Sequence, residues 1–231
     1  AFIEGVQGTG DEFLDSNHIM ATAKHFIGDG GTFKGIDKGD TRISEGGLKN
    51  IHGTPYYSAF EACVQSVMAS FNSWNGVKMH GHEYLLTDVL RDQMGFNGLV
   101  VGDWNGHGEV PGCTNANCPE SFNAGVDIYM APDEWKELYT NTVRAVKSGD
   151  ISEDRLNDAV RKILTVKDRL GMLDGRKPHE YENYVGKIEH RELAREAVSK
   201  SLVLLKNNDN LLPLDSTKPV SYTHLTLPTI E

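Results

Sequence analysis

The sequence has no cluster of basic residues and no run of about 18 apolar residues. Its 23 Lys and Arg residues are outnumbered by 33 Asp and Glu residues, which gives a formal net charge of −10 over 231 residues. Because nucleic-acid binding requires clustered cations beside the phosphates, we expect no nucleic-acid partner. The missing apolar run likewise predicts no membrane span. Neutral or polar small molecules are the partners that this composition favours.

The chain also lacks a basic, then apolar, leader, and its first residue is Ala rather than Met. We therefore expect it to be an incomplete piece that leaves any export signal outside. The sequence contains neither a Walker pattern nor a dinucleotide-binding fingerprint, so we do not expect nucleotide binding.

Cysteine is scarce, with three residues in the chain. Cys113 and Cys118, in "GCTNANC", are close enough in sequence to form a disulfide, which would indicate an oxidising compartment. Two free thiols in a polar loop are the alternative, and both interpretations stay open. The pair supplies too few ligands for a zinc site, so we expect no metal.

Four short apolar or β-favouring segments recur along the chain: "ATAKHF", "QSVMASF", "GLVVGD" and "VDIYMA". Segments with helical spacing lie between them, over 47–64 and 83–95, and Gly95 is a typical helix stop. Alternating strands and helices indicate an α/β fold with a parallel sheet. Since a barrel of eight such units needs about 250 residues, four units predict half of a (β/α)8 TIM-like barrel.

A closing helix follows, with Ser152 as its N-cap and an apolar face that includes Leu156, Val160 and Leu164. A polar stretch and a new amphipathic helix then indicate a linker and a second domain. The final residues have neither helical nor strand periodicity, which indicates a non-native tail. The expected divisions are the half-barrel over 1–174, the linker over 175–190, the start of an α/β sandwich over 191–219 and the tail over 220–231.

Asp103 directly follows the apolar segment "GLVV" and is followed by Trp104. The carboxyl ends of barrel strands carry the catalytic groups in nearly all barrel enzymes, so Asp103 is a candidate catalytic carboxylate. Trp104 offers an apolar face on which a pyranose can stack. A structural role for Asp103, as a helix cap or in an Asx turn, is the alternative.

The segment "KHFIGDGG" brings Lys24, His25 and Asp29 to the end of another predicted strand. Lys24 and His25 can hydrogen-bond sugar hydroxyls there. A Lys24–Asp29 salt bridge that stiffens the loop is the structural alternative.

The segment "MHGHE" contains His80, His82 and Glu83 and superficially resembles a metal cluster. Ligands on a helix usually recur after three or four residues, and these two histidines are two apart. We therefore predict solvated or capping histidines rather than a metal site.

Four motifs in this order, "ATAKHFIGDGGT", "SFNSWNGVKMHG", "GFNGLVVGDWNG" and "NAGVDIYMAP", resemble the second half of the catalytic barrel of family 3 glycoside hydrolases. The resemblance covers about residues 1–219 and is greatest to the bacterial exo-acting β-glucosidases and glucan glucohydrolases. It implies a (β/α)8-like barrel followed by an α/β sandwich, and retaining release of glucose from the non-reducing ends of β-glucosides or β-glucan oligosaccharides. It also implies that no metal or cofactor takes part.

The resemblance makes Asp103 the nucleophile that forms the glycosyl-enzyme intermediate. Lys24 and His25 correspond to the pair that binds the hydroxyls of the innermost sugar, and Trp104 to the aromatic wall of the next subsite. The expected substrates are β-linked gluco-oligosaccharides and aryl β-glucosides.

Met68 and Phe71 fall where the family lines its pocket, although many members have Tyr in place of Phe71. Gly35 stands where other β-glucosidases of the family carry an Arg, and this departure favours the exo-glucanase branch.

The family resemblance places the proton donor in the second domain, and an Asp and an Arg for the same sugar in the first half of the barrel. We therefore expect this chain alone to be inactive. β-Xylosidase, β-N-acetylhexosaminidase and a non-catalytic carbohydrate-binding relative are the alternatives, and the loop after "KHFIGDGGT" lacks the Asp-x-His pair usual in the hexosaminidases. For the whole protein we expect periplasmic or secreted localisation, with the cytoplasm as the alternative.

Overall fold

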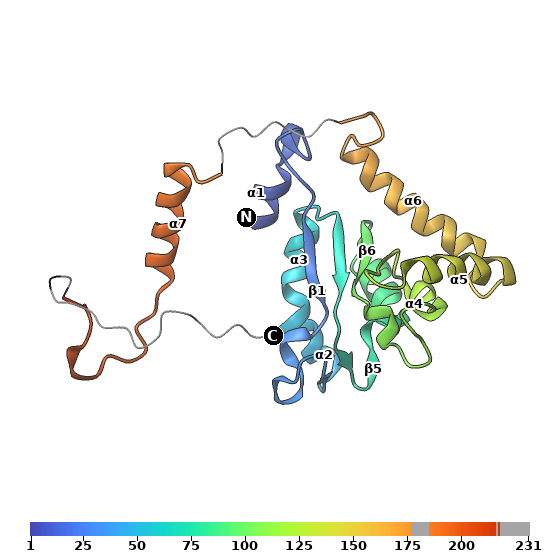
Figure 1. Ribbon diagram of the computed structural model, residues 1–231, viewed down its shortest axis with the longest axis horizontal. Helices are drawn as coiled ribbons and strands as arrows, with labels where there is room; N and C mark the ends of the chain where they lie inside the picture. The colour runs from blue at the N-terminus through green and yellow to red at the C-terminus, as the bar shows by residue number, and fades with distance from the viewer. Residues whose placement is uncertain (177–184, 216, 218–231) are drawn as a thin grey trace. The chain divides into compact units, whose positions relative to one another are not determined.

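The computed structural model describes residues 1–176, 185–215 and 217. These residues group into two compact units, Ala1–His179 and Glu180–Glu231 (Figure 1). Every candidate site residue lies in the first unit. None of the helices in the described ranges combines the length and apolar character that a bilayer crossing requires.

A four-stranded sheet forms the centre of the first unit. Its strands are β1 (Thr22–Phe26), β3 (Ser66–Ala69), β6 (Leu99–Trp104) and β7 (Ile128–Met130). The spatial order is β1-β3-β6-β7, and every neighbouring pair is parallel. The four predicted strand segments are therefore confirmed, together with the α/β class. Because all four strands run the same way, their carboxyl ends meet at one edge of the sheet.

Helices form the crossovers that parallel strands require. After α1 (Phe2–Gln7) and β1, the first crossover holds α2 (Glu45–Gly47), η4 (Leu48–Gly53) and α3 (Thr54–Glu61). The second holds η6 (Tyr84–Gln93), and the third holds α4 (Pro119–Ala124). The helix predicted over 83–95 thus forms, and Gly95 follows it with a φ of 71°, the left-handed conformation of a helix stop.

A second, three-stranded sheet was not predicted. Its strands β2 (Asp40–Thr41), β4 (Ser73–Trp74) and β5 (Val77–Lys78) lie in the order β2-β4-β5. Short helical turns η2 (Asp29–Gly31), η3 (Phe33–Gly35), η5 (Met79–Gly81) and η7 (Gly106–Glu109) lie in the connections after the strands, whereas η1 (Gly10–Glu12) precedes β1. This small sheet lies in the connections that follow β1 and β3, near the edge that carries the candidate site.

The main core lies between the sheet and the crossover helices. Its fully buried side chains include Phe26, Val67, Val100 and Val126, one from or beside each strand of the large sheet. Aromatic rings extend this core, since the Phe26 and Tyr56 ring centroids are 5.0 Å apart with the planes nearly perpendicular. Burial of these side chains is the main stabilising contribution to the unit.

Two longer helices, α5 (Trp135–Ser148) and α6 (Glu153–Arg169), follow β7 and gather with α4 beyond β6 (Figure 1). The predicted cap is confirmed, because the Ser152 side chain accepts a hydrogen bond from the Arg155 N–H. The apolar face differs from the prediction. Leu156 packs against a small core with Ala159, whereas Val160 and Leu164 are 43% and 45% exposed.

Asp127, just before β7, anchors this side of the sheet. Its fully buried carboxylate contacts Arg91 Nη2 at 2.5 Å and Arg155 Nη2 at 2.9 Å, and accepts the Val100 N–H at 2.8 Å. The two arginines come from η6 and α6, so one acid joins two helices to the sheet. It lies at the amino end of β7, opposite the edge where barrel enzymes place their chemistry.

The second unit contains α7 (Ile188–Ser201) and the short turn η8 (Asn208–Asn210). A helix in this region was predicted from 191 to 205, and it begins and ends a few residues earlier. Half of the predicted linker, residues 177–184, and all of the predicted tail, 220–231, lie outside the described residues.

Candidate active site

Asp103 lies at the carboxyl end of β6, and its side chain is 15% exposed. Its Oδ1 accepts the Trp104 N–H at 2.7 Å, which orients the carboxylate. The turn η7 that follows is preceded by Asn105 and has no side-chain cap, so Asp103 does not cap it. A partly exposed carboxylate at this edge of the sheet can act as a nucleophile or a base.

His25 reaches Asp103 from β1, across the end of the intervening strand β3. Its Nε2 lies 3.4 Å from Asp103 Oδ2, and its Nδ1 lies 3.3 Å from Asp29 Oδ2. The alternative interpretation, in which Lys24 pairs with Asp29 to stiffen the loop, is not what the structure shows. His25 makes that contact instead, and so connects two carboxylates.

Lys24 is exposed and lines an open cavity of about 440 Å³ beside β1. His25, Asp29 and His52 line the same cavity. Asp103 lies outside this lining and is connected to the cavity through its contact with His25. The cavity thus gathers a cation, two imidazoles and a carboxylate, groups that can bind hydroxyls.

The Trp104 side chain is 59% exposed at the end of β6. Asn105 follows in the left-handed conformation, with a φ of 52°, and its amide donates to Asp133 Oδ2 at 2.8 Å. The Asn105 N–H donates to the Met130 carbonyl at 2.9 Å, so the chain directly after the indole is still held to the end of β7. An exposed aromatic face beside Asp103 is suited to stacking on a sugar ring.

Met68 and Phe71 come from β3 and the residues after it. Met68 is buried and pairs in register with Val101, two residues before Asp103. The Phe71 ring is half-buried, and its centroid lies 5.9 Å from that of His80. Both residues are therefore close along the sheet to the end of β6.

His80 occupies a different place from the one predicted. It is not solvated: only 2% of it is exposed, and its Nε2 accepts the backbone N–H of Asp103 at 2.8 Å. Burial lowers the pKa of His80 to about 4, against the opposing effect of the Asp103 charge. His82 does act as a partial cap, because its Nδ1 accepts the Leu85 N–H at 3.4 Å. The two-residue spacing of His80 and His82 in the sequence does not indicate how deeply either ring is buried.

A further group at this edge was missed. Glu109 accepts hydrogen bonds from Lys38 at 2.7 Å and from Lys78 at 3.2 Å. The Lys38 hydrogen bond, with that of Lys78, holds the pKa of Glu109 below its ordinary value. Lys78 also donates to the Phe71 carbonyl, and the Lys38 ammonium lies 4.3 Å from the Phe71 ring centroid. No sequence spacing signals this cluster, because its members are far apart along the chain.

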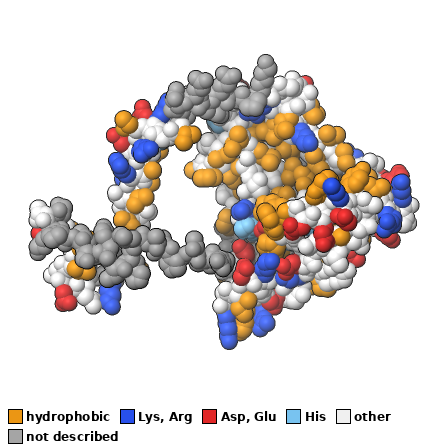
Figure 2. Space-filling model, viewed as in Figure 1, with side chains coloured by type: hydrophobic (Ala, Val, Ile, Leu, Met, Phe, Trp, Pro, Cys, Tyr) orange, Lys and Arg blue, Asp and Glu red, His pale blue; other side chains and the backbone are white. Residues whose placement is uncertain are grey.

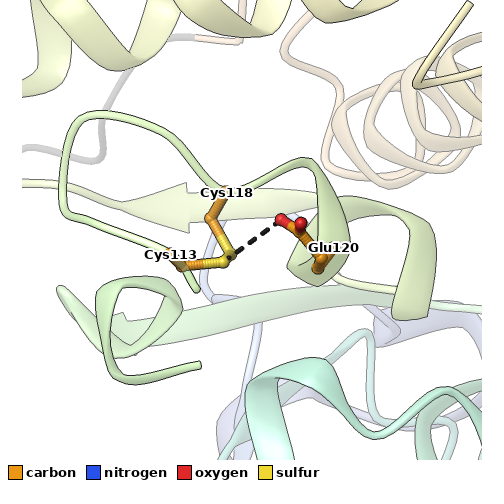
Figure 3. A group of neighbouring side chains, drawn as sticks. All are labelled: Cys113, Cys118 and Glu120. Carbon is orange, nitrogen blue, oxygen red and sulfur yellow. Dashed lines mark hydrogen bonds between the residues drawn. A yellow bond between two sulfur atoms is a disulfide. The ribbon is translucent and has the colours of Figure 1, made fainter. Parts of the chain in front are cut away.

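Cys113 and Cys118 form a disulfide, which decides between the two interpretations that the sequence left open. Glu120 Oε2 lies 3.3 Å from Cys113 Sγ (Figure 3). This group has the spacing of a metal cluster, but disulfide sulfurs are not thiolates and do not act as zinc ligands. The described residues therefore offer no functional metal-ligand set here.

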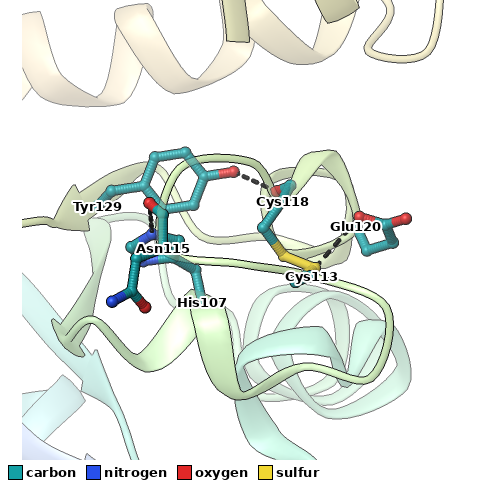
Figure 4. The surroundings of a disulfide bond; sticks show 6 residues. All are labelled: His107, Cys113, Asn115, Cys118, Glu120 and Tyr129. Carbon is teal, nitrogen blue, oxygen red and sulfur yellow. Dashed lines mark hydrogen bonds between the residues drawn. A yellow bond between two sulfur atoms is a disulfide. The ribbon is translucent and has the colours of Figure 1, made fainter. Parts of the chain in front are cut away.

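The disulfide closes a loop that packs against η7. His107 Nε2 contacts the Asn115 carbonyl at 2.8 Å, and the Tyr129 hydroxyl donates to the Cys118 carbonyl at 2.5 Å (Figure 4). The His107 and Tyr129 ring centroids are 4.7 Å apart. The loop thus supports the segment that follows Asp103 and Trp104.

Residues 1–166 match the family described as glycosyl hydrolase family 3 N terminal domain. A β-xylosidase of Formosa agariphila is 40% identical over 94% of this chain. The exo-1,3/1,4-β-glucanase ExoP of a Pseudoalteromonas species superposes with a TM-score of 0.87 at 52% identity over 92% of the chain. A mutant β-glucosidase of Listeria innocua in complex with laminaribiose superposes with a TM-score of 0.80 at 28% identity, also over 92% of the chain.

The match covers only part of each relative. The chain spans 32% of the xylosidase, 27% of the exo-glucanase and 30% of the Listeria enzyme. The family match nevertheless includes β1, β3, β6 and β7 and all the residues that gather at their carboxyl ends. The chain belongs to glycosyl hydrolase family 3, and residues 1–166 are part of its N-terminal domain.

Proposed function

We propose that this chain carries the nucleophile of a retaining β-glucosidase or exo-β-glucanase, and that Asp103 is the nucleophile. The observation that carries the proposal is the Asp103 carboxylate at the carboxyl edge of a parallel sheet, with His25 Nε2 3.4 Å from its Oδ2. Family 3 membership and the sugar-processing names of the relatives support it.

In the first step, an Asp103 oxygen attacks C1 of the terminal β-glucosyl unit. The C1–O bond to the leaving group breaks, and the departing oxygen takes a proton from a general acid. In the second step, water attacks C1, its proton returns to that acid, and the C1–Asp103 bond breaks. Glucose is released with its β configuration retained. We place the acid in a second domain outside this chain, as the family resemblance implies.

The proposed subsite for the terminal sugar uses Lys24 and His25 on its hydroxyls, with Met68 and Phe71 along β3. Lys24 and His25 already line one cavity, which favours this role. The exposed indole of Trp104 would stack on the next sugar toward the reducing end. We propose β-linked gluco-oligosaccharides and aryl β-glucosides as substrates, without a cofactor.

β-Xylosidase is the second candidate activity. Its support is the 40% identity with the Formosa xylosidase. Laminaribiose bound to the Listeria enzyme and the name of ExoP favour glucose instead. Aryl β-glucoside and aryl β-xyloside differ only in the hydroxymethyl group at C5, so their kcat/KM ratio decides between the two.

We also propose the predicted organisation: a half-barrel over 1–174, a linker over 175–190 and the start of an α/β sandwich over 191–219. β1 is an edge strand of the large sheet, and the view in Figure 2 shows many hydrophobic side chains on the surface of the first unit. An edge strand and exposed apolar faces are what a barrel lacking its first strands would present. Among the exposed side chains are Ile51, Val160 and Leu164.

We propose export from the cytoplasm, and the Cys113–Cys118 disulfide is the support for it. A disulfide persists in the periplasm or outside the cell, whereas cytoplasmic thiols are kept reduced.

Chemical rescue tests the nucleophile in the complete enzyme that contains this chain. Asp103→Gly should reduce turnover of an activated aryl β-glucoside by several orders of magnitude. Added azide should restore it and yield α-glucosyl azide, because azide would attack C1 from the face that the carboxylate vacates. Asp29→Gly, which removes the other carboxylate beside His25, is the matched control and should give no azide product. Normal turnover by Asp103→Gly would refute the assignment.

A further inference from the structure

The His80 ring contacts the backbone of Asp103, the proposed nucleophile, and not the Asp103 carboxylate. The imidazole Nε2 accepts the Asp103 N–H at 2.8 Å, and 2% of His80 is exposed. This bond is made at the residue whose carboxylate must lie within attacking distance of C1. It therefore acts on the position of Asp103 without touching the reacting atoms.

The second ring nitrogen fixes which form of the ring is present. The His80 ring also hydrogen-bonds the backbone of Ser70, directly after β3. Because Nε2 accepts a hydrogen bond from the Asp103 N–H, the hydrogen of the neutral ring must be on Nδ1, where it can be donated to the Ser70 backbone. Protonation of Nε2 would remove the acceptor, and burial opposes that protonation.

The chain around Asp103 closes tightly on this ring. A Cβ added to Gly106 would lie 2.3 Å from His80 Nε2, and one added to Gly102 would lie 3.4 Å from it. The end of β6 before Asp103 and the turn η7 after it thus both pack against the imidazole. Side chains at Gly106 would displace either the ring or the turn.

The His80 ring also links the end of β6 to the ends of β1 and β3. Ser70 N donates to the Phe26 carbonyl at 2.7 Å, so the end of β3 is held to the end of β1, beside His25. The His80 ring then joins Ser70 to Asp103. One buried side chain completes a path of hydrogen bonds from β1 through β3 to β6.

We propose that His80 is a positioning residue for catalysis, holding the backbone of Asp103 so that its carboxylate stays aligned with His25 and with C1 of the sugar. This inference rests on the proposed function of Asp103. Misplacement by about 1 Å costs about 100-fold in rate in well-aligned active sites, so loss of the acceptor should slow attack by Asp103.

His82 supplies a matched comparison. It is 8% exposed, lies two residues along the same segment, and also accepts a backbone N–H, that of Leu85. Its ring packs against Trp74 and Tyr84, away from Asp103. A purely structural role for buried histidines predicts similar effects of His80→Leu and His82→Leu, whereas a positioning role does not.

The test uses the complete enzyme and 2,4-dinitrophenyl 2-deoxy-2-fluoro-β-glucoside. Asp103 attacks C1, the C1–O bond breaks, and dinitrophenolate leaves as the anion without needing the general acid. The 2-fluoro group slows hydrolysis of the adduct, so the burst of dinitrophenolate reports the attack step alone. The variants are His80→Leu, His80→Gln, whose amide oxygen reaches the Nε2 position, and His82→Leu.

We expect the burst rate to fall about 10- to 100-fold in His80→Leu, to recover to within a few-fold of wild type in His80→Gln, and to stay near wild type in His82→Leu. An unchanged rate in His80→Leu, or equal losses in both Leu variants, would overturn the proposal. If His80→Leu does not fold, His80→Asn replaces it, since its amide is too short to reach Asp103 N. Equal rates for the Asn and Gln variants would then overturn the proposal.

Failure of the proposed function gives a different result. If Asp103 is not the nucleophile, wild-type enzyme forms no adduct on Asp103. If only the His80 role is wrong, wild type and His80→Leu form that adduct at the same rate.

Discussion

His25 and Asp103 belong to strands that do not pair with each other, and yet His25 Nε2 lies 3.4 Å from Asp103 Oδ2. The imidazole spans the end of β3 to make this contact. Its other nitrogen is 3.3 Å from Asp29 Oδ2, so the ring is held from both sides. The site is therefore a product of the parallel sheet, which brings the ends of β1 and β6 to one edge.

Removal of the Asp29 carboxylate should weaken substrate binding more than chemistry. Asp29→Ala takes away the carboxylate that contacts the His25 ring at 3.3 Å, at a cost of about 1 kcal/mol or less for one partly exposed charged contact. We expect kcat/KM on an aryl β-glucoside to fall about 2- to 10-fold, mostly through KM. Asp37→Ala, at an exposed position in the same loop region, is the control and should change neither constant. A drop of several orders of magnitude in kcat would contradict this subsidiary role.

Asp127→Ala should be the most damaging of these substitutions to stability. It leaves Arg91 and Arg155, which are 10% and 15% exposed in their side chains, without their shared carboxylate. Breaking a buried charge cluster in this way costs about 3 to 5 kcal/mol. Urea unfolding should show this loss, while Asp154→Ala at an exposed position of α6 should change the free energy of unfolding by less than about 0.5 kcal/mol. Equal midpoints for the two variants would be incompatible with an anchoring role for Asp127.

Acid should destabilise the fold through His80. Its pKa is lowered by burial from 6.5 to about 4, so between these values the unfolded chain binds a proton that the folded chain does not. Stability contributed by neutral His80 is therefore complete above about pH 6.5 and is lost as pH falls toward 4, at up to about 1.4 kcal/mol per pH unit.

The comparison is the pH dependence of thermal unfolding of wild type and His80→Gln. Asp103, His107 and Glu109 are the charged or titratable groups whose charges act on His80, and all three are kept in both proteins. The wild-type curve should fall more steeply between pH 6.5 and 4. Parallel curves would show that His80 does not supply this dependence.

The disulfide should contribute to stability and not to chemistry. Cys113 and Cys118 close a short loop, for which loop entropy gives about 2 kcal/mol. Cys113→Ser with Cys118→Ser should lower the unfolding free energy by about that amount and leave kcat within a few-fold of wild type. Cys63→Ser, at a free and exposed cysteine, is the control and should have no effect. A stability unchanged by the double substitution would contradict the assigned role of the loop.

Local signals predicted the large elements well. Ser152 before an acidic turn marked the start of α6, and Gly95 marked the end of the second crossover helix, because both act within one helical turn. The four strands of the large sheet followed from short apolar segments. The exposure of Val160 and Leu164 could not be predicted, because it depends on which neighbours cover α6.

The small sheet was missed although one signal for it is present. Asn75 and Gly76 both have positive φ, 48° and 90°, as the two central residues of a tight hairpin turn require. This Asn-Gly pair joins β4 and β5, whose two-residue lengths are too short to show alternation. The Asn-Gly pair is therefore a better indicator of this hairpin than the periodicity of its strands.

The candidate site was predicted in part. Asp103, Lys24 and His25 stood out because each follows or ends an apolar strand. His80 was noted in the sequence but predicted to be solvated or capping, because its burial and its bond to Asp103 N depend on how residues 23 positions apart fold together. The contact between Lys38 and Glu109, which are 71 residues apart in the sequence, was missed for the same reason. Sequence spacing reports local geometry, and these contacts are set by tertiary packing.

Peptide mapping of the glycosyl-enzyme adduct identifies the nucleophile itself. The complete enzyme is inactivated with 2,4-dinitrophenyl 2-deoxy-2-fluoro-β-glucoside, digested at low pH, and the labelled residue is located by tandem mass spectrometry. We expect one fluoroglucosyl group per enzyme, on the Asp103 carboxylate. A label on any other carboxylate, or steady turnover of β-glucosides by an enzyme that forms no adduct, would show that Asp103 is not the nucleophile.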